Sequence, residues 1–103
     1  MKIKVGQTLY EVRYEETERE NGNYGATYHK ISRINIDPGV SDGERRDTIL
    51  HEVLHTCTHF AGIGEEDKLS EEEFISRVTP ILLNVMCENP HLIKELCPPV
   101  TRA

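Results

Sequence analysis

Residues 41–62, SDGERRDTILHEVLHTCTHFAG, decide the fold because they hold a complete signal for one long helix. Ser41 and Glu44 form a capping box, in which a hydroxyl and a carboxylate satisfy free amides at a helix start. Gly62 is the residue type that most often ends a helix. The apolar side chains between them recur at helical spacing and predict a stripe that faces the core. The members of this stripe are Ile49, Leu50, Val53, Leu54, Cys57, Phe60 and Ala61.

The same helix carries the motif H-E-x-x-H at residues 51–55. Residues four apart lie on one face of a helix, so the imidazoles of His51 and His55 can reach one cation. On a helical wheel both lie opposite the apolar stripe, which argues against a role as core histidines. Glu52 points in another direction and can take a proton from a water bound to the metal. The motif predicts a zinc site with His51 and His55 as ligands and Glu52 as general base, and the competing interpretation is a solvated polar face.

A catalytic zinc site usually has three protein ligands, so another side chain is needed. The next helix is expected to begin with a capping box that engages Glu73. Glu71 lies three and four residues before apolar positions of that helix and is expected to point with them toward the first helix, whereas Glu72 is turned further out. We expect Glu71 or Glu72 to complete the site, although acids at a helix start are also favoured without a metal. His59 is an alternative, but three histidines along one straight helix would span about 12 Å.

The sequence around this helix predicts an α+β fold in one domain of residues 1–103. Apolar and polar residues alternate before the helix, as in half-buried strands, and follow the helical period after it. Asn89 is expected to cap the last helix with Pro90 in its first position, and Pro80 to kink or split the helix before it. The pattern predicts a small, mostly antiparallel sheet packed on two main helices, with a short C-terminal helix. Expected strands cover residues 2–5, 8–14, 24–28 and 31–37, and expected helices cover residues 41–61, 71–88 and 90–96.

Composition argues against several classes of function. The 103 residues hold 12 basic and 18 acidic side chains, a net charge of -6, without a basic stripe that could neutralise phosphates, so nucleic-acid binding is disfavoured. No apolar run approaches the roughly 20 residues of a membrane span, and residues 1–10 lack the apolar segment of a signal peptide. We therefore expect a cytoplasmic protein. Its three cysteines are expected to be reduced, with Cys57 and Cys87 as small core residues.

Two segments resemble small phage and prophage zincin-like proteins related to the metallopeptidase domain of the ImmA/IrrE type. They are RINIDPGVSDGERRDTILHEVLH at residues 33–55 and EEEFISRVTPILLNVMCENP at residues 71–90. The resemblance implies a minimal zincin in a bacterial host cytosol, with His51 and His55 as zinc ligands, Glu52 as general base and an acid on the following helix as the last ligand. It also implies that the strand at residues 31–37 flanks the active-site helix, and that a substrate peptide pairs with the sheet edge next to the metal.

These patterns predict a zinc-dependent metallopeptidase that cleaves a protein or peptide substrate with a zinc-bound water activated by Glu52. The chain is short for an enzyme, and a homodimer would supply a deeper cleft. The alternative is a non-catalytic, zinc-stabilised binding module that engages a host or phage protein, and a third interpretation is a metal-free interaction domain. A peptidase also needs a donor for the developing oxyanion. The candidates by residue type alone are Tyr24, Tyr28, His29 and His91.

Overall fold

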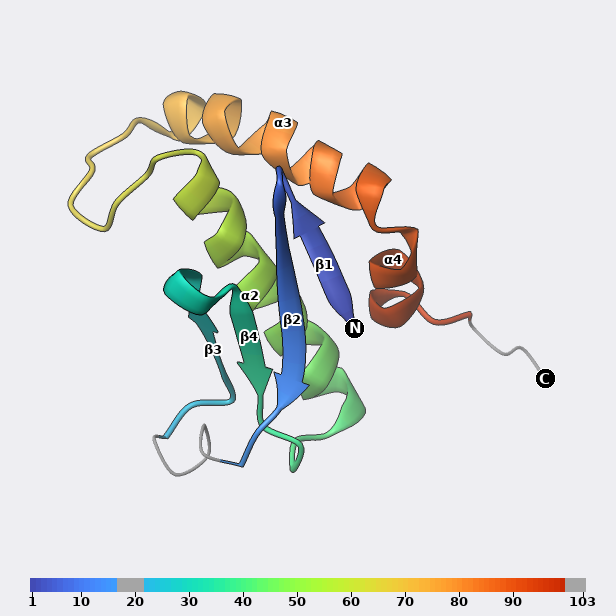
Figure 1. Cartoon of the computed structure of the whole chain (residues 1–103). Helices are drawn as coiled ribbons and strands as arrows, with labels where there is room; N and C mark the ends of the chain where they lie inside the picture. Colours follow the sequence, from blue (N-terminus) through green and yellow to red (C-terminus); the bar gives the residue numbers. More distant parts are fainter. Residues whose placement is uncertain (17–21, 100–103) are drawn as a thin grey trace.

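A four-stranded sheet and the helices on one of its faces make up the computed structural model, which describes residues 1–16 and 22–99 (Figure 1). The strand order is β1-β2-β4-β3, with β2 parallel to β4 and the two outer pairs antiparallel. This arrangement confirms the α+β class and the mostly antiparallel sheet. The strands are β1 (Lys2–Val5), β2 (Thr8–Tyr14), β3 (Gly25–Tyr28) and β4 (Arg33–Ile36). The helices are the 3-10 turn η1 (His29–Ile31), α2 (Asp42–Phe60), α3 (Glu71–Glu88) and α4 (Pro90–Leu96).

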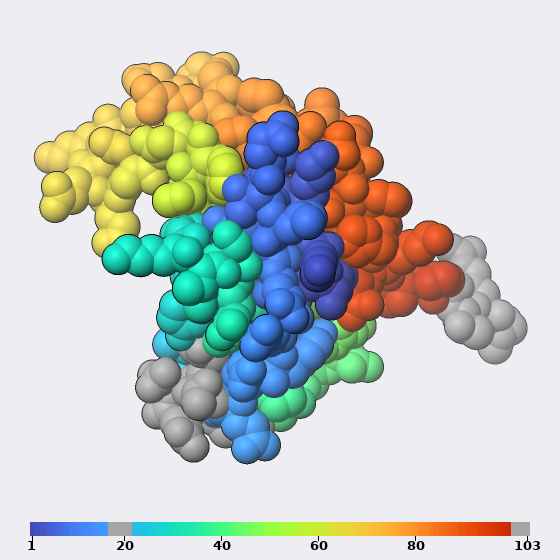
Figure 2. All heavy atoms as spheres, in the orientation of Figure 1, coloured from blue at the N-terminus to red at the C-terminus, as the bar shows by residue number. Residues whose placement is uncertain are grey.

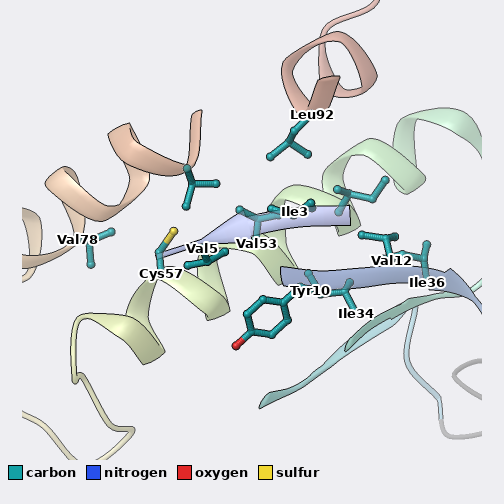
Figure 3. Packing of buried hydrophobic residues seen from close by; sticks show 12 residues of the cluster. Ile3, Val5, Tyr10, Val12, Ile34, Ile36, Val53, Cys57, Val78 and Leu92 are labelled. Atoms are coloured by element: carbon teal, nitrogen blue, oxygen red, sulfur yellow. The ribbon is translucent and has the colours of Figure 1, made fainter. Parts of the chain in front are cut away.

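The core lies between the sheet and the helices, because alternate residues of β1, β2 and β4 point toward α2 (Figure 3). Each fully buried isoleucine or valine stabilises the fold by roughly 1.5–3 kcal/mol relative to an exposed one. The sheet residues of the core are Ile3, Val5, Tyr10, Val12, Ile34 and Ile36, and the helix residues are Ile49, Val53, Cys57, Val78, Val85 and Leu92. None of the helices within the described ranges is both long and apolar enough to cross a bilayer.

Local signals set the ends of the helices as expected. The Ser41 hydroxyl accepts a hydrogen bond from the backbone N–H of Glu44, and the Ser70 hydroxyl accepts one from Glu73 at 3.1 Å. Gly62 has a positive φ of 72°, which glycine adopts without strain. The expected split at Pro80 does not occur, and α3 continues through it. Pro80 is exposed, and its missing N–H removes only one backbone bond of the helix.

The buried face of α2 is narrower than the apolar stripe predicted. Ile49, Val53 and Cys57 are buried, whereas Leu50 and Leu54 remain 42% and 38% exposed. Leu50 lines an apolar groove of about 550 Å³ between α2, α3 and α4 instead of packing against the sheet. Phe60 is 39% exposed and its ring contacts Tyr10 edge-on, and Cys87 is exposed rather than in the core. All three cysteines are free thiols, as expected.

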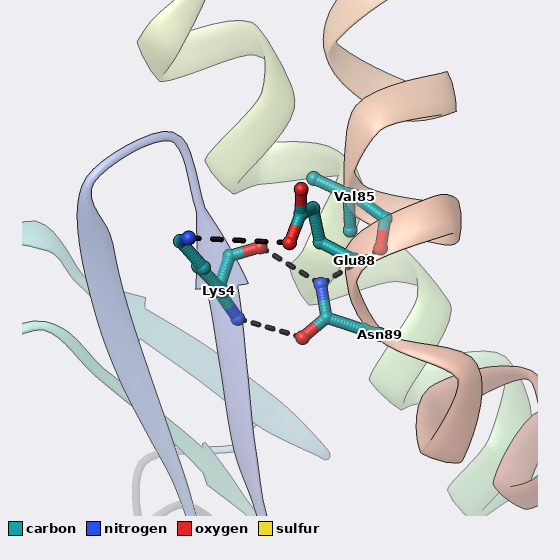
Figure 4. A network of polar contacts seen from close by, with 4 residues as sticks. All are labelled: Lys4, Val85, Glu88 and Asn89. Atoms are coloured by element: carbon teal, nitrogen blue, oxygen red, sulfur yellow. Dashed lines mark hydrogen bonds and ion pairs between the residues drawn. The ribbon is translucent and has the colours of Figure 1, made fainter.

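The outer edge of β1 is closed by side chains from the junction of α3 and α4. The side-chain amide of Asn89 accepts from the Lys4 N–H and donates to the Lys4 carbonyl, both at 2.8 Å, and also donates to the Val85 carbonyl (Figure 4). His91 donates to the Lys2 carbonyl at 2.6 Å. Asn89 occupies the N-cap position of α4, but its side chain makes no capping bond because it is used across the sheet edge.

The opposite edge of the sheet is β3. β4, which corresponds to the expected strand at residues 31–37, lies inside the sheet between β2 and β3. In the part of the chain that the structure describes, no strand pairs with the outer side of β3. β4 contacts α2, as expected for the strand at residues 31–37, because Ile34 and Ile36 lie in the core beside Ile49.

Candidate metal centre

His51 and His55 lie one turn apart in the middle of α2, and both are exposed. Their Nε2 atoms face each other at 3.2 Å, with the ring planes inclined at 70°. Two nitrogens that share one zinc ion at about 2.0–2.1 Å each, in tetrahedral geometry, are about 3.3 Å apart. The helix therefore holds the two imidazole nitrogens at the spacing that a shared zinc ion requires.

Glu52 lies beside this pair and is only 5% exposed. The Thr27 hydroxyl of β3 donates to the Glu52 carboxylate at 3.0 Å and also lies 3.3 Å from the Glu52 carbonyl. A buried carboxylate with one fixed donor is held in one orientation. Gly25 makes this contact possible, because a Cβ at that position would lie 2.7 Å from the Thr48 side chain and 3.0 Å from the Asn35 carbonyl. β3 can therefore rest directly on α2.

An open hollow of about 480 Å³ lies between β3, η1, α2 and the loop before α3. The two histidines and Glu52 line it together with two further groups that can bind a cation, the imidazole of His29 and the carboxylate of Glu65. Figure 2 shows the loop that follows α2 reaching toward η1 on this side of the molecule. The full lining is Asn23, Gly25, Ala26, Thr27, His29, His51, Glu52, His55 and Glu65.

His29 belongs to a cluster of aromatic side chains at the rim of the hollow. Its ring stacks on His59 with centroids 3.8 Å apart and planes inclined by 7°. Its Nδ1 lies 2.9 Å from the hydroxyl of Tyr10. Burial lowers the pKa of His29, and the nearby His59 and His55 lower it further. Burial raises the pKa of the Tyr10 phenol. Both side chains are therefore held in their neutral forms near pH 7.

The third ligand expected from the sequence is not assembled in the described part of the chain. Among residues 1–16 and 22–99, no three His, Cys, Asp or Glu side chains are close enough together to hold a metal ion. Glu71 and Glu72 lie exposed in the first turn of α3, outside the lining of the hollow, and His59 is stacked on His29. All three remain predictions as ligands.

The four candidate oxyanion donors are separated by the fold. His29 lines the hollow, and Tyr24 lines a neighbouring one of about 300 Å³ that also contains His51, Glu52 and Asp47. Tyr28 lies next to Thr27 on β3, and alternation places it on the other face of the sheet. His91 lies at the β1 edge and is bonded to Lys2.

Sequence reasoning did not single out three of the residues at this site. Thr27 and Gly25 lie in a short strand that carried no motif, and only the packing of β3 on α2 reveals them. Glu65 had a weak signal, since it begins an acidic run ten residues after His55. Loop acids are common, so this spacing alone could not distinguish Glu65 from its neighbour Glu66.

Comparisons of the chain with protein-family models, with curated proteins and with solved structures found no match. The resemblance to zincin-like proteins therefore depends on residues 33–55 and 71–90 alone. The geometry of the histidine pair and of Glu52 has to carry any functional conclusion.

Proposed function

We propose that the protein is a zinc-dependent metallopeptidase of the phage or prophage type, which hydrolyses a peptide bond with water activated by Glu52. The observation that carries this proposal is the 3.2 Å separation of the His51 and His55 Nε2 atoms, beside a buried carboxylate oriented by Thr27.

The donor set fits zinc in chemistry as well as in spacing. Neutral imidazoles are preferred ligands of this ion, and His51 and His55 are exposed and accessible to it. Glu65 offers a carboxylate in the same hollow. When bound, zinc polarises a carbonyl group and lowers the pKa of a coordinated water toward about 7.

Glu52 supplies the proton transfers of the reaction. One carboxylate oxygen accepts a hydrogen bond from Thr27, and the carboxylate lines the hollow. It accepts the proton of the attacking water as the bond to the carbonyl carbon forms, and it passes this proton to the leaving nitrogen as the peptide bond breaks. The Thr27 bond holds the carboxylate in place for both transfers.

The outer side of β3, with which no described strand pairs, supports a peptide as substrate. A chain added along this edge would form backbone hydrogen bonds with β3 and lie over the hollow that contains His51 and Glu52. Gly25 and Ala26 of this strand line the hollow. The strand that accepts the substrate in this proposal is therefore β3, at residues 25–28.

The test compares Glu52→Gln with Glu66→Gln, which changes an exposed acid outside the lining of the hollow. Both variants are loaded with zinc, and hydrolysis of a mixed peptide library is followed by mass spectrometry. We expect Glu52→Gln to keep its zinc and to lose activity by a factor of about 10²–10⁴, as for removal of a general base. Equal activity of the two variants, or a wild-type protein that binds no zinc, would contradict the proposal.

One observation favours the alternative of a zinc-stabilised binding module. Leu50 and Met86, which line the apolar groove between the helices, are 42% and 45% exposed. Exposed apolar surface of this kind is typical of contacts with another protein. If Glu52→Gln keeps the full biological effect of the wild type while Leu50→Glu abolishes it, the binding module is the correct interpretation.

A further inference from the structure

We infer that His29 donates a hydrogen bond from its Nε2–H to the carbonyl oxygen of a peptide bound in the hollow that contains His51 and Glu52. This inference rests on the proposed peptidase function and adds to it a residue that contacts the substrate. It also selects one of the four oxyanion donors that residue type alone left open.

The position of His29 follows from the course of the chain. η1 begins directly after the edge strand β3, and its first residue is His29. Ser32 then adopts a left-handed conformation with φ 51°, which turns the chain back into β4. A peptide that extends β3 beside α2 therefore passes His29 at one end of the strand, in the same hollow as the histidine pair.

The ring of His29 is fixed before any substrate binds. On one face it stacks on His59 of α2, with planes only 7° from parallel. At its edge it meets Tyr10, with ring centroids 6.1 Å apart and planes at 89°. A donor that is already oriented costs no reorganisation when charge develops on the substrate oxygen, which is the requirement for an oxyanion donor.

The contact with Tyr10 determines which nitrogen of His29 carries the proton. Tyr10 is 1% exposed, and in the described part of the chain its hydroxyl has one hydrogen-bond partner, Nδ1 of His29. A buried hydroxyl has to donate its own proton somewhere, so it donates to Nδ1, which then acts as the acceptor. The proton of the neutral ring is therefore on Nε2, the nitrogen that is not bonded to the Tyr10 hydroxyl.

The tautomer of His29 determines whether this residue can act as a hydrogen-bond donor or as a metal ligand. A protonated Nε2 can donate to a carbonyl oxygen but cannot bind zinc, whereas a ligand role would need a bare Nε2 and a protonated Nδ1. The donor role thus predicts that zinc affinity does not depend on His29.

The first experiment reads the tautomer directly in the metal-free protein. Long-range ¹H–¹⁵N spectra of the histidine side chains distinguish a protonated Nε2 from a protonated Nδ1. We expect His29 in the Nε2–H form, and a mixture of the two forms in Tyr10→Phe, which keeps the ring of Tyr10 but removes its hydroxyl. A predominant Nδ1–H form in the wild type would overturn the inference, whatever the activity of the protein.

The second experiment measures zinc affinity and peptide turnover in His29→Phe, which keeps a ring to stack on His59. We expect turnover to fall about 10²–10³-fold, as for loss of one oxyanion donor, with the zinc dissociation constant unchanged. His29→Gln keeps an N–H donor and should recover part of the turnover, which also controls for a folding defect in the phenylalanine variant. Lys30→Ala, an exposed neighbour in η1, should behave as the wild type.

The outcomes separate the two proposals. Wild-type turnover in His29→Phe, or a tenfold or greater loss of its zinc affinity, refutes the donor role of His29 and leaves the peptidase proposal intact. Zinc binding by a wild type that cleaves no peptide refutes the peptidase proposal, and the donor role falls with it. Turnover lost in His29→Phe and partly recovered in His29→Gln, at constant zinc affinity, supports both.

Discussion

The two edges of the sheet differ in how their backbone groups are used. At the β1 edge, side chains of Asn89 and His91 bond the outward N–H and carbonyl groups of Lys4 and the carbonyl of Lys2. At the β3 edge, no described strand covers the outer side, and the adjoining hollow contains His51 and Glu52. Proteins usually block exposed edges because these invite pairing with other chains. In the proposed function, the substrate peptide pairs with the β3 edge, where no described strand is bound.

The largest expected effect on stability is at the sealed edge. Asn89→Ala removes one buried and two partly buried hydrogen bonds and leaves both backbone groups of Lys4 without their partner. We expect a loss of about 3 kcal/mol in the free energy of unfolding, measured by urea denaturation. Asn84→Ala, on the exposed side of α3, is the matched control and should cost less than about 0.5 kcal/mol. If Asn89→Ala loses no more stability than the control, the hydrogen bonds of Asn89 at the β1 edge do not stabilise the fold.

At the open edge, Gly25→Ala should separate β3 from α2. The added Cβ would lie 2.7 Å from the Thr48 side chain and 3.0 Å from a backbone carbonyl, so the strand has to move. We expect a loss of about 1–3 kcal/mol in the free energy of unfolding, together with a loss of peptide turnover, because Thr27 moves away from Glu52. Gly43→Ala, where the Cβ meets nothing within 4 Å, is the control. Stability and turnover equal to this control would contradict the close packing of β3.

Thr27→Val tests the orientation of Glu52 without changing the size of the side chain. The substitution removes the 3.0 Å hydrogen bond from the Thr27 hydroxyl to the Glu52 carboxylate. We expect turnover to fall about tenfold, since one hydrogen bond contributes roughly 0.5–1.5 kcal/mol, while zinc affinity stays unchanged. Kinetics and competition titration with a zinc chelator provide the two values. If turnover is unaffected, Thr27 does not orient the base.

The smallest expected effect is on the pH dependence of stability. The pKa of His29 in the folded protein lies below its usual 6.5, so the unfolded chain takes up a proton at a higher pH than the folded one does. The stability that neutral His29 contributes is therefore fully present above the pKa of 6.5 that applies to the unfolded chain. It is lost as the pH falls from there through the lower pKa of the folded protein. Unfolding free energies measured from neutral to acidic pH should decrease more steeply in the wild type than in His29→Gln. Parallel curves for the two proteins would contradict this.

Most of the elements could be predicted from the sequence because their signals are local. The serines at 41 and 70, the glycine at 62 and the alternation in β1 and β2 act within a few residues, and each marks an element end or face in the structure. The H-E-x-x-H spacing placed both imidazoles together for the same reason, since one helical turn fixes their separation. The roles of Leu50 and Leu54 could not be predicted this way, because helical spacing does not say how wide a face the sheet will cover.

The contacts at the β1 edge and the remainder of the site depend on distant parts of the chain. Asn89 resembles an ordinary N-cap in sequence, yet its side chain bonds a strand 85 residues away. Tyr10 and His29 meet because β2 and the turn after β3 are brought together by the sheet. Glu65 enters the hollow through the path of a loop, which has no periodic pattern to read. The position of the third ligand also depends on contacts between distant segments, so helix geometry alone could not determine it.

The measurement that tests the central claim most directly is a crystal structure of the zinc-loaded protein. The account predicts one ion with the Nε2 atoms of His51 and His55 each about 2.1 Å away, and with the Glu52 carboxylate beside it but not bound to it. The same map would identify the remaining ligand among Glu65, Glu71, Glu72 and His59. An ion bound elsewhere, or two imidazole rings turned apart with no ion between them at saturating zinc, would contradict the account.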